Sequence, residues 1–299
     1  MSNKEIDDVT GAETTGHVWD GDIKELNKPL PKWWLYTFYA CIIWSIGYWI
    51  VYPAWPTMDG YTVGIWNYSQ RQVVADDIKD ARLRQAKYVE QIGKLPLGEI
   101  RSSEELFAFA QAGGKASFGD NCAPCHGTGA QGAKGYPNLN DDDWIWGGRL
   151  EDIEKTIAGG IRVGTEESRE SAMPRFGLDK MLDAKQIDDV ANYVLALASG
   201  AHDAAAAARG KTIYLEQCAA CHQENGTGNQ ELGAPNLTDG IWLFGGSKED
   251  IVTSISTGRG GVMPAWKGRL DSATLKMLTL YISSLGGATS VQAASTPPK

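Results

Sequence analysis

The chain has 299 residues, a formal net charge of −9 and 42% hydrophobic residues. This length allows about two domains of ordinary size, and the hydrophobic content excludes wholesale disorder. The acidic balance argues against nucleic-acid binding, which needs a basic face, and it permits a basic protein partner attracted over long range.

The first element that the sequence predicts is a membrane span. Residues 1–32 are polar, and residues 33–56 contain no charged side chain. About 20 helical residues cross a hydrocarbon core of ~30 Å. Tryptophan and tyrosine stand at both ends of the segment, as they do at membrane interfaces. A long polar segment precedes it and no small-residue cleavage site follows, so we predict a retained single transmembrane helix in contact with lipid, and not a signal peptide.

The lysines near this span predict its orientation. Lys24, Lys28 and Lys32 precede it closely, and the first basic residue after it is Arg71. The positive-inside rule therefore predicts a cytoplasmic N-terminus and places the bulk of the chain on the other side of the membrane.

Residues 57–102 are predicted to form a linker outside the membrane, with an amphipathic helix over residues 65–95. Apolar residues recur at helical spacing at Val74, Ile78 and Val89. The sequence leaves two interpretations of this helix open, a spacer and a contact with a partner subunit near the membrane.

Two copies of Cys-x-x-Cys-His follow, at Cys122, Cys125 and His126 and again at Cys218, Cys221 and His222. Each is an attachment motif for a c-type haem, in which both thiols form thioethers with the haem vinyl groups and the histidine binds the iron. The one remaining cysteine is Cys41, so none is left for a disulfide framework. We therefore predict two covalently bound c-type haems. Bacteria attach such haems outside the cytoplasm, which agrees with the predicted orientation.

The motifs belong to a tandem repeat. Its equivalent residues, in chain order, are Gly114 and Gly210, Pro137 and Pro235, Trp144 and Trp242, Glu151 and Glu249, Met173 and Met263, and Tyr193 and Tyr281. We expect one domain over residues 103–200 and a second over residues 201–287, followed by a flexible tail over residues 288–299.

Each repeat is predicted to contain three main helices: residues 103–118, 150–159 and 183–198 in the first, and 205–217, 248–257 and 271–285 in the second. The expected fold is mostly α, with one N-terminal transmembrane helix followed by two tandem class-I-like cytochrome c domains.

Met173 and Met263 are the candidates for the second axial ligand of each iron. They lie 47 and 41 residues after the motif histidines, each before a proline. A thioether ligand raises the potential of a haem. Core packing is the alternative and explains Met181 and Met277. Whether each methionine serves its own repeat or the other stays open.

The chain contains two further histidines, and two of its tryptophans occupy equivalent positions in the repeats. His17 precedes the span, and His202 lies in the joint between the repeats, which makes two bis-histidine sites impossible and leaves His202 as a weaker alternative ligand. Trp144 and Trp242 fit either a haem edge or an ordinary core.

The loops at residues 137–139 and 235–237 are expected to offer a backbone carbonyl to the histidine ring. Residues 127–132 match Gly-x-Gly-x-x-Gly, but no strand is predicted before them, so a dinucleotide site is disfavoured. The motif cysteines are 96 residues apart, which disfavours a shared zinc site.

The N-terminal region resembles one family. The segments HVWDG at residues 17–21, LNKPLPKWW at residues 26–34 and YPAWP at residues 52–56 resemble the dihaem subunit III, of FixP/CcoP type, of cbb3-type cytochrome c oxidases. The resemblance extends over nearly the whole chain, from the single span to the two cytochrome c repeats.

The resemblance implies an electron-transfer subunit with no catalytic residue of its own, in a proton-translocating oxidase of the bacterial inner membrane. It implies that electrons come from a periplasmic cytochrome c or the bc1 complex and pass through a monohaem subunit to the haem–copper catalytic subunit. Alternatives are a free-standing membrane-anchored dihaem shuttle, a dihaem peroxidase and a redox or ligand sensor. A peroxidase would need an open coordination site on one iron.

Overall fold

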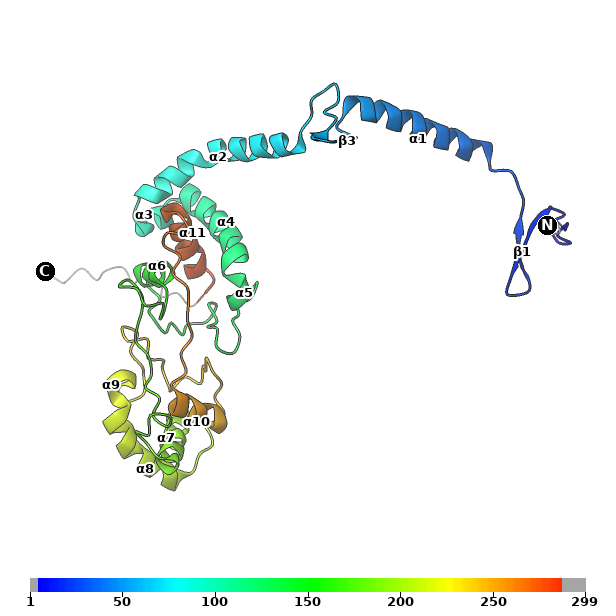
Figure 1. The fold of residues 1–299 in the computed structure, drawn as a ribbon. Helices are drawn as coiled ribbons and strands as arrows, with labels where there is room; N and C mark the ends of the chain where they lie inside the picture. Colours follow the sequence, from blue (N-terminus) through cyan, green and yellow to red (C-terminus); the bar gives the residue numbers. More distant parts are fainter. Residues whose placement is uncertain (1–4, 287–299) are drawn as a thin grey trace. The chain divides into compact units, whose positions relative to one another are not determined.

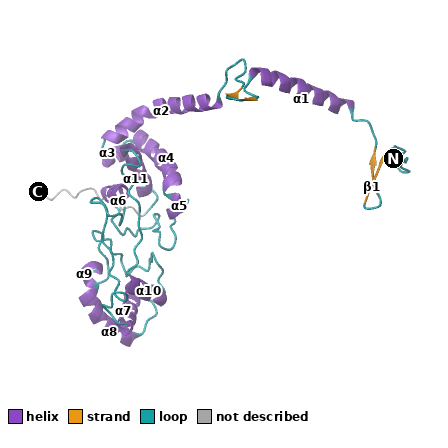
Figure 2. Cartoon of the chain, viewed as in Figure 1, coloured by secondary structure: helices purple, strands orange, loops and turns teal. Residues whose placement is uncertain are grey.

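A computed structural model describes residues 5–286. The chain divides into two compact units, residues 1–83 and 84–299, and each is described by itself. Both are mainly helical, and the only sheets among the described residues are two short hairpins (Figures 1 and 2). The expected flexible tail at residues 288–299 lies outside the described residues.

The first unit begins with a β-hairpin where the sequence indicated only a polar segment. Strands β1 (Thr14–Trp19) and β2 (Ile23–Leu26) pair antiparallel. Asp20 and Gly21 in the connection both have positive φ, 52° and 90°. Asp-Gly is a favoured pair for such turns, so the signal for this hairpin was present in the sequence.

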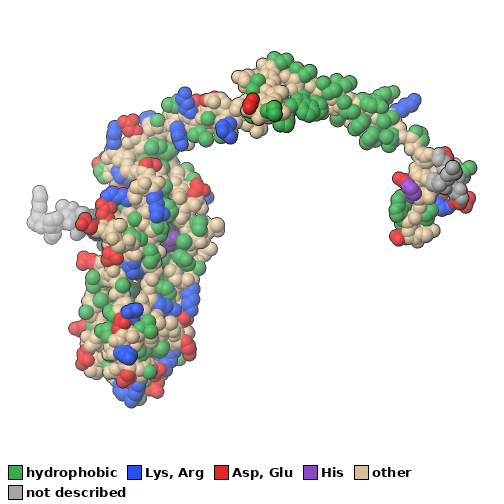
Figure 3. All heavy atoms as spheres, in the orientation of Figure 1, with side chains coloured by type: hydrophobic (Ala, Val, Ile, Leu, Met, Phe, Trp, Pro, Cys, Tyr) green, Lys and Arg blue, Asp and Glu red, His purple; other side chains and the backbone are tan. Residues whose placement is uncertain are grey.

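Helix α1 (Lys32–Val51) corresponds to the predicted span. None of its residues is buried in the structure, and its surface is almost entirely hydrophobic (Figure 3). The helix ends earlier than the predicted residue 56, because Tyr52 precedes Pro53 and is extended.

The chain then folds back on the end of α1 through strands β3 (Pro56–Thr57) and β4 (Gly60–Tyr61). A Cβ atom at Gly64 would lie 2.3 Å from the carbonyl oxygen of Val51, so only glycine fits this close approach.

The second unit takes in the C-terminal end of helix α2 (Gln70–Lys94), the helix predicted over residues 65–95. Ile92 at this end is fully buried and packs with the short helix α3 (Leu97–Ser102). Pro96 separates the two helices, as a proline does when it can begin a helix but not continue one.

The two repeats contain equivalent helices. Those of the first repeat are α4 (Glu104–Asn121), α5 (Ala123–His126), α6 (Leu150–Gly159) and α7 (Ala184–Leu197). Those of the second are α8 (Ala204–Gln217), α9 (Ala219–His222), α10 (Lys248–Thr257) and α11 (Ser272–Ser283). The predicted helices are present, and their ends agree with the prediction to within three residues, with 150–159 and 248–257 matching at both ends.

The final helices pack across the repeats. Helix α11 lies against α4, and α7 lies against α8 (Figure 1). At the first crossing a Cβ atom on Gly114 would lie 2.3 Å from the carbonyl oxygen of Met277, and at the second a Cβ atom on Gly210 would lie 2.0 Å from that of Asp189. The expected boundary between residues 200 and 201 separates the sequence repeats, but each packed pair takes one helix from each repeat.

Of the three hydrophobic cores among the described residues, two each contain part of one Cys-x-x-Cys-His motif or pack against it. Phe118, Ile153 and Leu278 belong to the core around the first motif. Val190 and Tyr214 belong to the core around the second motif, together with Ile251. We call the first motif with its core the first site, and the second motif with its core the second site.

Candidate haem sites

Each motif forms a single helical turn, α5 or α9, directly after the long helix of its repeat. Both final residues donate a backbone N–H to the carbonyl of the leading cysteine, at 2.9 Å for His126 to Cys122 and for His222 to Cys218. The turn brings the cysteines and histidine of one motif close together.

The histidine rings are oriented in the same way at both sites. The Nδ1–H of His126 donates to the carbonyl oxygen of Pro137 at 3.0 Å, and that of His222 to Pro235 at 3.0 Å. This confirms the predicted role of the proline loops. The bond fixes the tautomer and leaves Nε2 available to a metal. Burial lowers the pKa of both rings, which keeps them neutral.

The Gly-x-Gly-x-x-Gly segment serves this geometry. Gly127 and Gly132 have positive φ, and the N–H of Gly132 donates to the carbonyl of His126 at 2.7 Å. A Cβ atom at Gly132 would lie 2.5 Å from the carbonyl oxygen of Tyr136. The segment follows a helix, not a strand, so the glycines turn the loop that returns Pro137 to the histidine and do not form a dinucleotide site.

The leading thiols are less exposed than the second thiols: Cys122 is buried and Cys218 is half-buried, whereas Cys125 and Cys221 are exposed. Burial raises the pKa of Cys122 to about 11, and that of Cys218 to about 11. Each motif supplies two thiols and one imidazole, the donor set that a covalently tethered haem requires.

A cavity of about 590 Å³ is lined by both motifs. Its walls are mostly apolar and include Trp144 and Trp242, which both also pack against the cores. Such a concave apolar chamber, with a few convergent polar groups, is what a large flat cofactor requires. Each tryptophan therefore lies in the cavity wall and packs against a core at the same time, so a place at a haem edge and ordinary core packing are compatible.

The methionine loops cross between the repeats. Met263 packs against the first-site core that contains Cys122, and Met173 packs against the second-site core beside Cys218. Met263 and Ile161 exchange backbone hydrogen bonds at 2.9 and 3.1 Å. Of the two methionines assigned to packing, Met277 is buried in a core, but the assignment is wrong for Met181, which is 52% exposed.

Close backbone approaches support this crossing at both sites. A Cβ atom at Gly160 would lie 2.5 Å from the carbonyl oxygen of Met263, and one at Gly258 would lie 2.4 Å from that of Met173. These glycines follow the middle helices of the first and the second repeat, so each methionine loop lies against the other repeat.

The two remaining histidines lie in different units. His17 is exposed on β1 of the first unit, with its ring 3.8 Å from a carboxylate oxygen of Glu25. His202 is exposed in the second unit, its Nδ1–H donates to the carbonyl of Gly200 at 2.8 Å, and it does not line the chamber between the motifs.

Some residues that connect the two sites were not predicted from the sequence. The ring of Trp146 lies where a side chain at Gly233 would be, within 2.2 Å of its Cβ position, and Phe244 lies beside Gly135 at an ordinary contact distance of 3.5 Å from that Cβ position. Arg162 also lines the shared cavity. Trp146 and Phe244 are equivalent in the repeats, as are Gly135 and Gly233, so the sequence carried a signal for an aromatic–glycine contact. Arg162 carried no such signal, because its equivalent in the second repeat is not an arginine.

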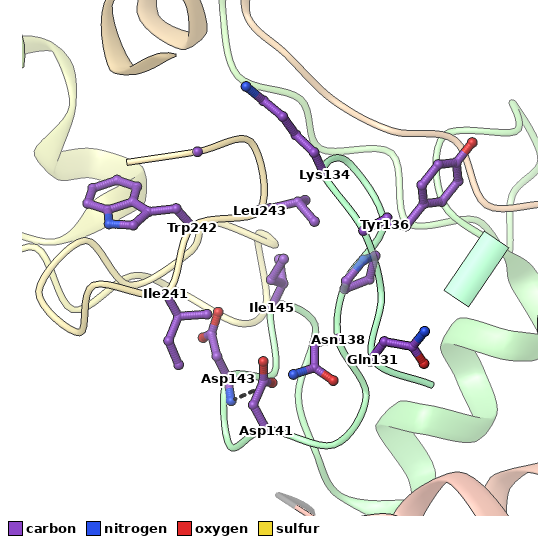
Figure 4. A pocket seen from close by; sticks show the side chains of 13 residues that line it. Gln131, Lys134, Tyr136, Asn138, Asp141, Asp143, Ile145, Ile241, Trp242 and Leu243 are labelled. Atoms are coloured by element: carbon purple, nitrogen blue, oxygen red, sulfur yellow. Dashed lines mark hydrogen bonds between the residues drawn. The ribbon is translucent and has the colours of Figure 1, made fainter. Parts of the chain in front are cut away.

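A smaller pocket of about 320 Å³ lies between loops of the two repeats (Figure 4). Asp143 lies there near Ile241 and donates its N–H to Asp141 at 3.3 Å. Burial raises the pKa of Asp143 to about 6, and the charges of Asp239 and Asp141 add to the effect.

Comparison with protein families finds three matching models. The N-terminal domain of cytochrome oxidase-cbb3, FixP, matches residues 11–59. Cytochrome c matches residues 111–198, and cytochrome c oxidase, cbb3-type, subunit III, matches residues 205–282.

Relatives match over almost their full length. The cbb3-type cytochrome c oxidase subunit FixP of Azorhizobium caulinodans is 52% identical over 94% of this chain and 96% of the relative. The subunit CcoP of Azospirillum brasilense is 50% identical over 96% and 99%, and that of Cereibacter sphaeroides is 48% identical over 92% and 94%. Identity at this level and coverage shows common descent, and the chain therefore belongs to the FixP/CcoP family, the cytochrome c-bearing subunits III of cbb3-type cytochrome c oxidases.

Proposed function

We propose that the chain carries two covalently bound c-type haems, one at Cys122 and Cys125 and one at Cys218 and Cys221. His126 and His222 are the proximal axial ligands. The matching motif turns, the carbonyl bond to each ring and the apolar cavity support this assignment.

We propose further that the distal ligands are exchanged between the repeats, with Met263 opposite His126 and Met173 opposite His222. The packing of each methionine against the other repeat's core is the observation that carries this pairing. Sequence spacing alone does not distinguish this pairing from one within each repeat.

The chain's own residues then have defined tasks. The carbonyls of Pro137 and Pro235 hold the histidine rings, and the hydrophobic cores exclude water from the cavity. A haem iron with histidine and methionine ligands carries one electron at a raised potential. Two full ligand pairs leave no open coordination position, which disfavours the peroxidase and sensor alternatives.

In the cell, we propose that this subunit receives electrons from a periplasmic cytochrome c or the bc1 complex. It passes them to the monohaem subunit and on to the haem–copper catalytic subunit of a proton-translocating oxidase. The relatives' names as oxidase subunits support this path. In the free-standing shuttle alternative, the purified protein would contain no haem–copper partner, and its deletion would leave oxidase activity intact.

The proposed topology has α1 in the bacterial inner membrane, the N-terminus in the cytoplasm and the haem sites in the periplasm. Three lysines before the span and the haem chemistry support it. A C-terminal alkaline phosphatase fusion should be active, because that enzyme matures only outside the cytoplasm. An inactive fusion at normal expression would contradict the topology.

The ligand pairing can be tested in chains that carry one haem. Mass spectrometry of the mature protein should first show two added haems. With Cys122 and Cys125 both changed to Ser, only the second haem remains, and Met173→Ala should abolish its near-infrared sulfur-to-iron band.

In that background Met263→Ala should leave the band in place, and Met181→Ala, at an exposed position, provides the matched control. Loss of the band with Met263→Ala alone would show that each methionine serves its own repeat.

A further inference from the structure

One arginine side chain is bonded to both methionine loops. Arg162 Nε donates to the carbonyl oxygen of Gly261 at 2.7 Å, and its Nη1 donates to that of Ser171 at 2.7 Å. Gly261 stands two residues before Met263, and Ser171 stands two residues before Met173. A single planar guanidinium therefore holds the two loops in a fixed relation.

The backbone at this position is adapted to the side chain. Arg162 has φ of +54°, in the left-handed region that side-chain-bearing residues rarely adopt. Such a conformation persists where the surrounding structure imposes it. The equivalent residue of the second repeat is Gly260, and a Cβ atom there would lie 3.2 Å from Arg162 Nε. The second repeat thus leaves space for the arginine of the first.

The charge of Arg162 faces the cavity that the two sites share. The residue lines this cavity, and its guanidinium carbon lies 6.0 Å from the ring centre of Trp146. Glu170 is the acid whose negative charge acts on the guanidinium. Burial lowers its pKa, but an arginine remains charged at every pH of interest.

With haems bound at both motifs, a fixed cation in the wall of the shared cavity would act on both irons. Ferric haem carries one more positive charge than ferrous haem, so a nearby positive charge disfavours the oxidised state. The effect is strong where water is excluded, because the local dielectric constant is low. The same residue also fixes the loops that supply both distal ligands.

We propose that Arg162 is a positioning residue that ties the two axial-methionine loops together and raises the potentials of both haems jointly. This inference rests on the proposed function, specifically on two haems with exchanged methionine ligands.

Redox titration of the full-length, haem-loaded protein tests the proposal. Arg162→Gln removes the charge, and at a fixed ambient potential the oxidised-to-reduced ratio of both haems should rise about tenfold, equivalent to 59 mV for a one-electron couple. The near-infrared band should weaken or shift at both sites. Arg162→Lys should keep both potentials close to those of the wild type, because an ammonium carries the same charge. It should not restore the band, because an ammonium lacks the planar pair of donors that bonds to both loops.

Arg259→Gln is the matched control. Arg259 is another partly buried arginine of the cavity wall, but its guanidinium bonds to the Asp250 carbonyl and to Ser254 Oγ, both on α10. This variant should not move both potentials together. If Arg162→Gln fails to fold, Arg162→Gly relieves the positive φ and removes the same charge.

Unchanged potentials in the Arg162 variants, or a change at one haem only, would overturn the inference. The wild-type protein separates this failure from failure of the proposed function. If wild type lacks two haems or the methionine band, the function proposal fails. If wild type has both and the variants behave like it, only the role of Arg162 is lost.

Discussion

The two candidate haem sites share the contacts that orient the motif histidine and position the final helix. They differ in the side chains around those contacts. His126 and His222 make the same 3.0 Å bond to a proline carbonyl, and a glycine lets the final helix approach closely at each site. At the crossings, however, Met277 covers Gly113 at the first site, whereas Asp189 bonds Arg209 at the second.

This difference separates two kinds of constraint. The hydrogen bond that orients the motif histidine is the same in both repeats. The side chains around this bond differ in charge between the repeats. We expect them to affect the stability of each site and the potential of a haem bound there. Arg162 faces Gly260, and Asp143 occupies the position that corresponds to Ile241. The predictions below test which of these differences matter.

The largest effect is expected at the helix crossings that both sites share. Gly210→Ala and Gly114→Ala each place a Cβ atom 2.0 to 2.3 Å from a backbone oxygen of the partner helix. Each should lower the free energy of unfolding by about 2 kcal/mol or more, because overpacking outweighs the ~1 kcal/mol that alanine gains in a helix. Denaturant unfolding followed by circular dichroism measures this loss.

Gly119→Ala is the control, since a Cβ atom there meets nothing within 4 Å. It should stabilise α4 by up to about 1 kcal/mol. If Gly114→Ala and Gly210→Ala behaved like this control, the exchange of final helices between repeats would be wrong.

The next effect concerns the ion pair found only at the second crossing. Asp189 is 4% exposed, and its carboxylate accepts from Arg209 Nε at 2.9 Å. This hydrogen bond holds the pKa of Asp189 below its usual value. Its contribution is therefore complete above the unfolded pKa of about 4 and is lost as the pH falls through the folded pKa.

Arg209→Gln should lower the melting temperature by about 3 °C at pH 7, and by less at pH 3. Arg175→Gln removes an exposed ion pair with Asp179 and should change little. A loss for Arg209→Gln that does not depend on pH would mean that packing, not charge, explains the effect.

The comparison also shows what the sequence could reveal. The span, the motif histidines, their proline loops and the three helices of each repeat were predictable, because each depends on local spacing or on a duplicated motif. The exchange of α7 and α11 was not, since the same apolar faces on Val190 and Leu278 would fit either partner. Arg162 left no signal because its partners are backbone carbonyls, which any residue provides.

A smaller effect is expected in the pocket between the repeats, where the first repeat has Asp143 and the second has Ile241. The pKa of Asp143 is raised to about 6, chiefly by burial, so the folded state holds a proton that the unfolded chain has released. Stability is therefore lost as the pH rises from about 4 to 6.

Asp143→Asn should be indistinguishable from wild type below pH 4 and more stable above pH 6, by about 1 kcal/mol once solvent screening of this half-buried group is allowed for. Urea unfolding at a series of pH values gives the comparison, with Asp142→Asn as the exposed control. An advantage that is equal at pH 4 and pH 8 would contradict the assignment to Asp143.

The smallest effect distinguishes the middle helices of the two sites. Ser247 caps α10, and its side chain accepts from the Asp250 N–H at 3.1 Å. Arg149 holds the same position at α6 with φ of −73° and ψ of 155°, which suits a cap, but it makes no capping bond. Ser247→Ala should cost about 1 kcal/mol, because a first-turn N–H loses its acceptor.

Arg149→Ser transfers the cap to the first site and should gain about 0.5 kcal/mol. The gain is less than the full value of a cap, because the exposed ion pair of Arg149 with Asp152 is lost. Arg149→Ala removes that pair without adding a cap and isolates its cost. A serine variant no more stable than the alanine variant would show that the backbone at Arg149, despite its dihedral angles, cannot present a side-chain oxygen to the first turn of α6.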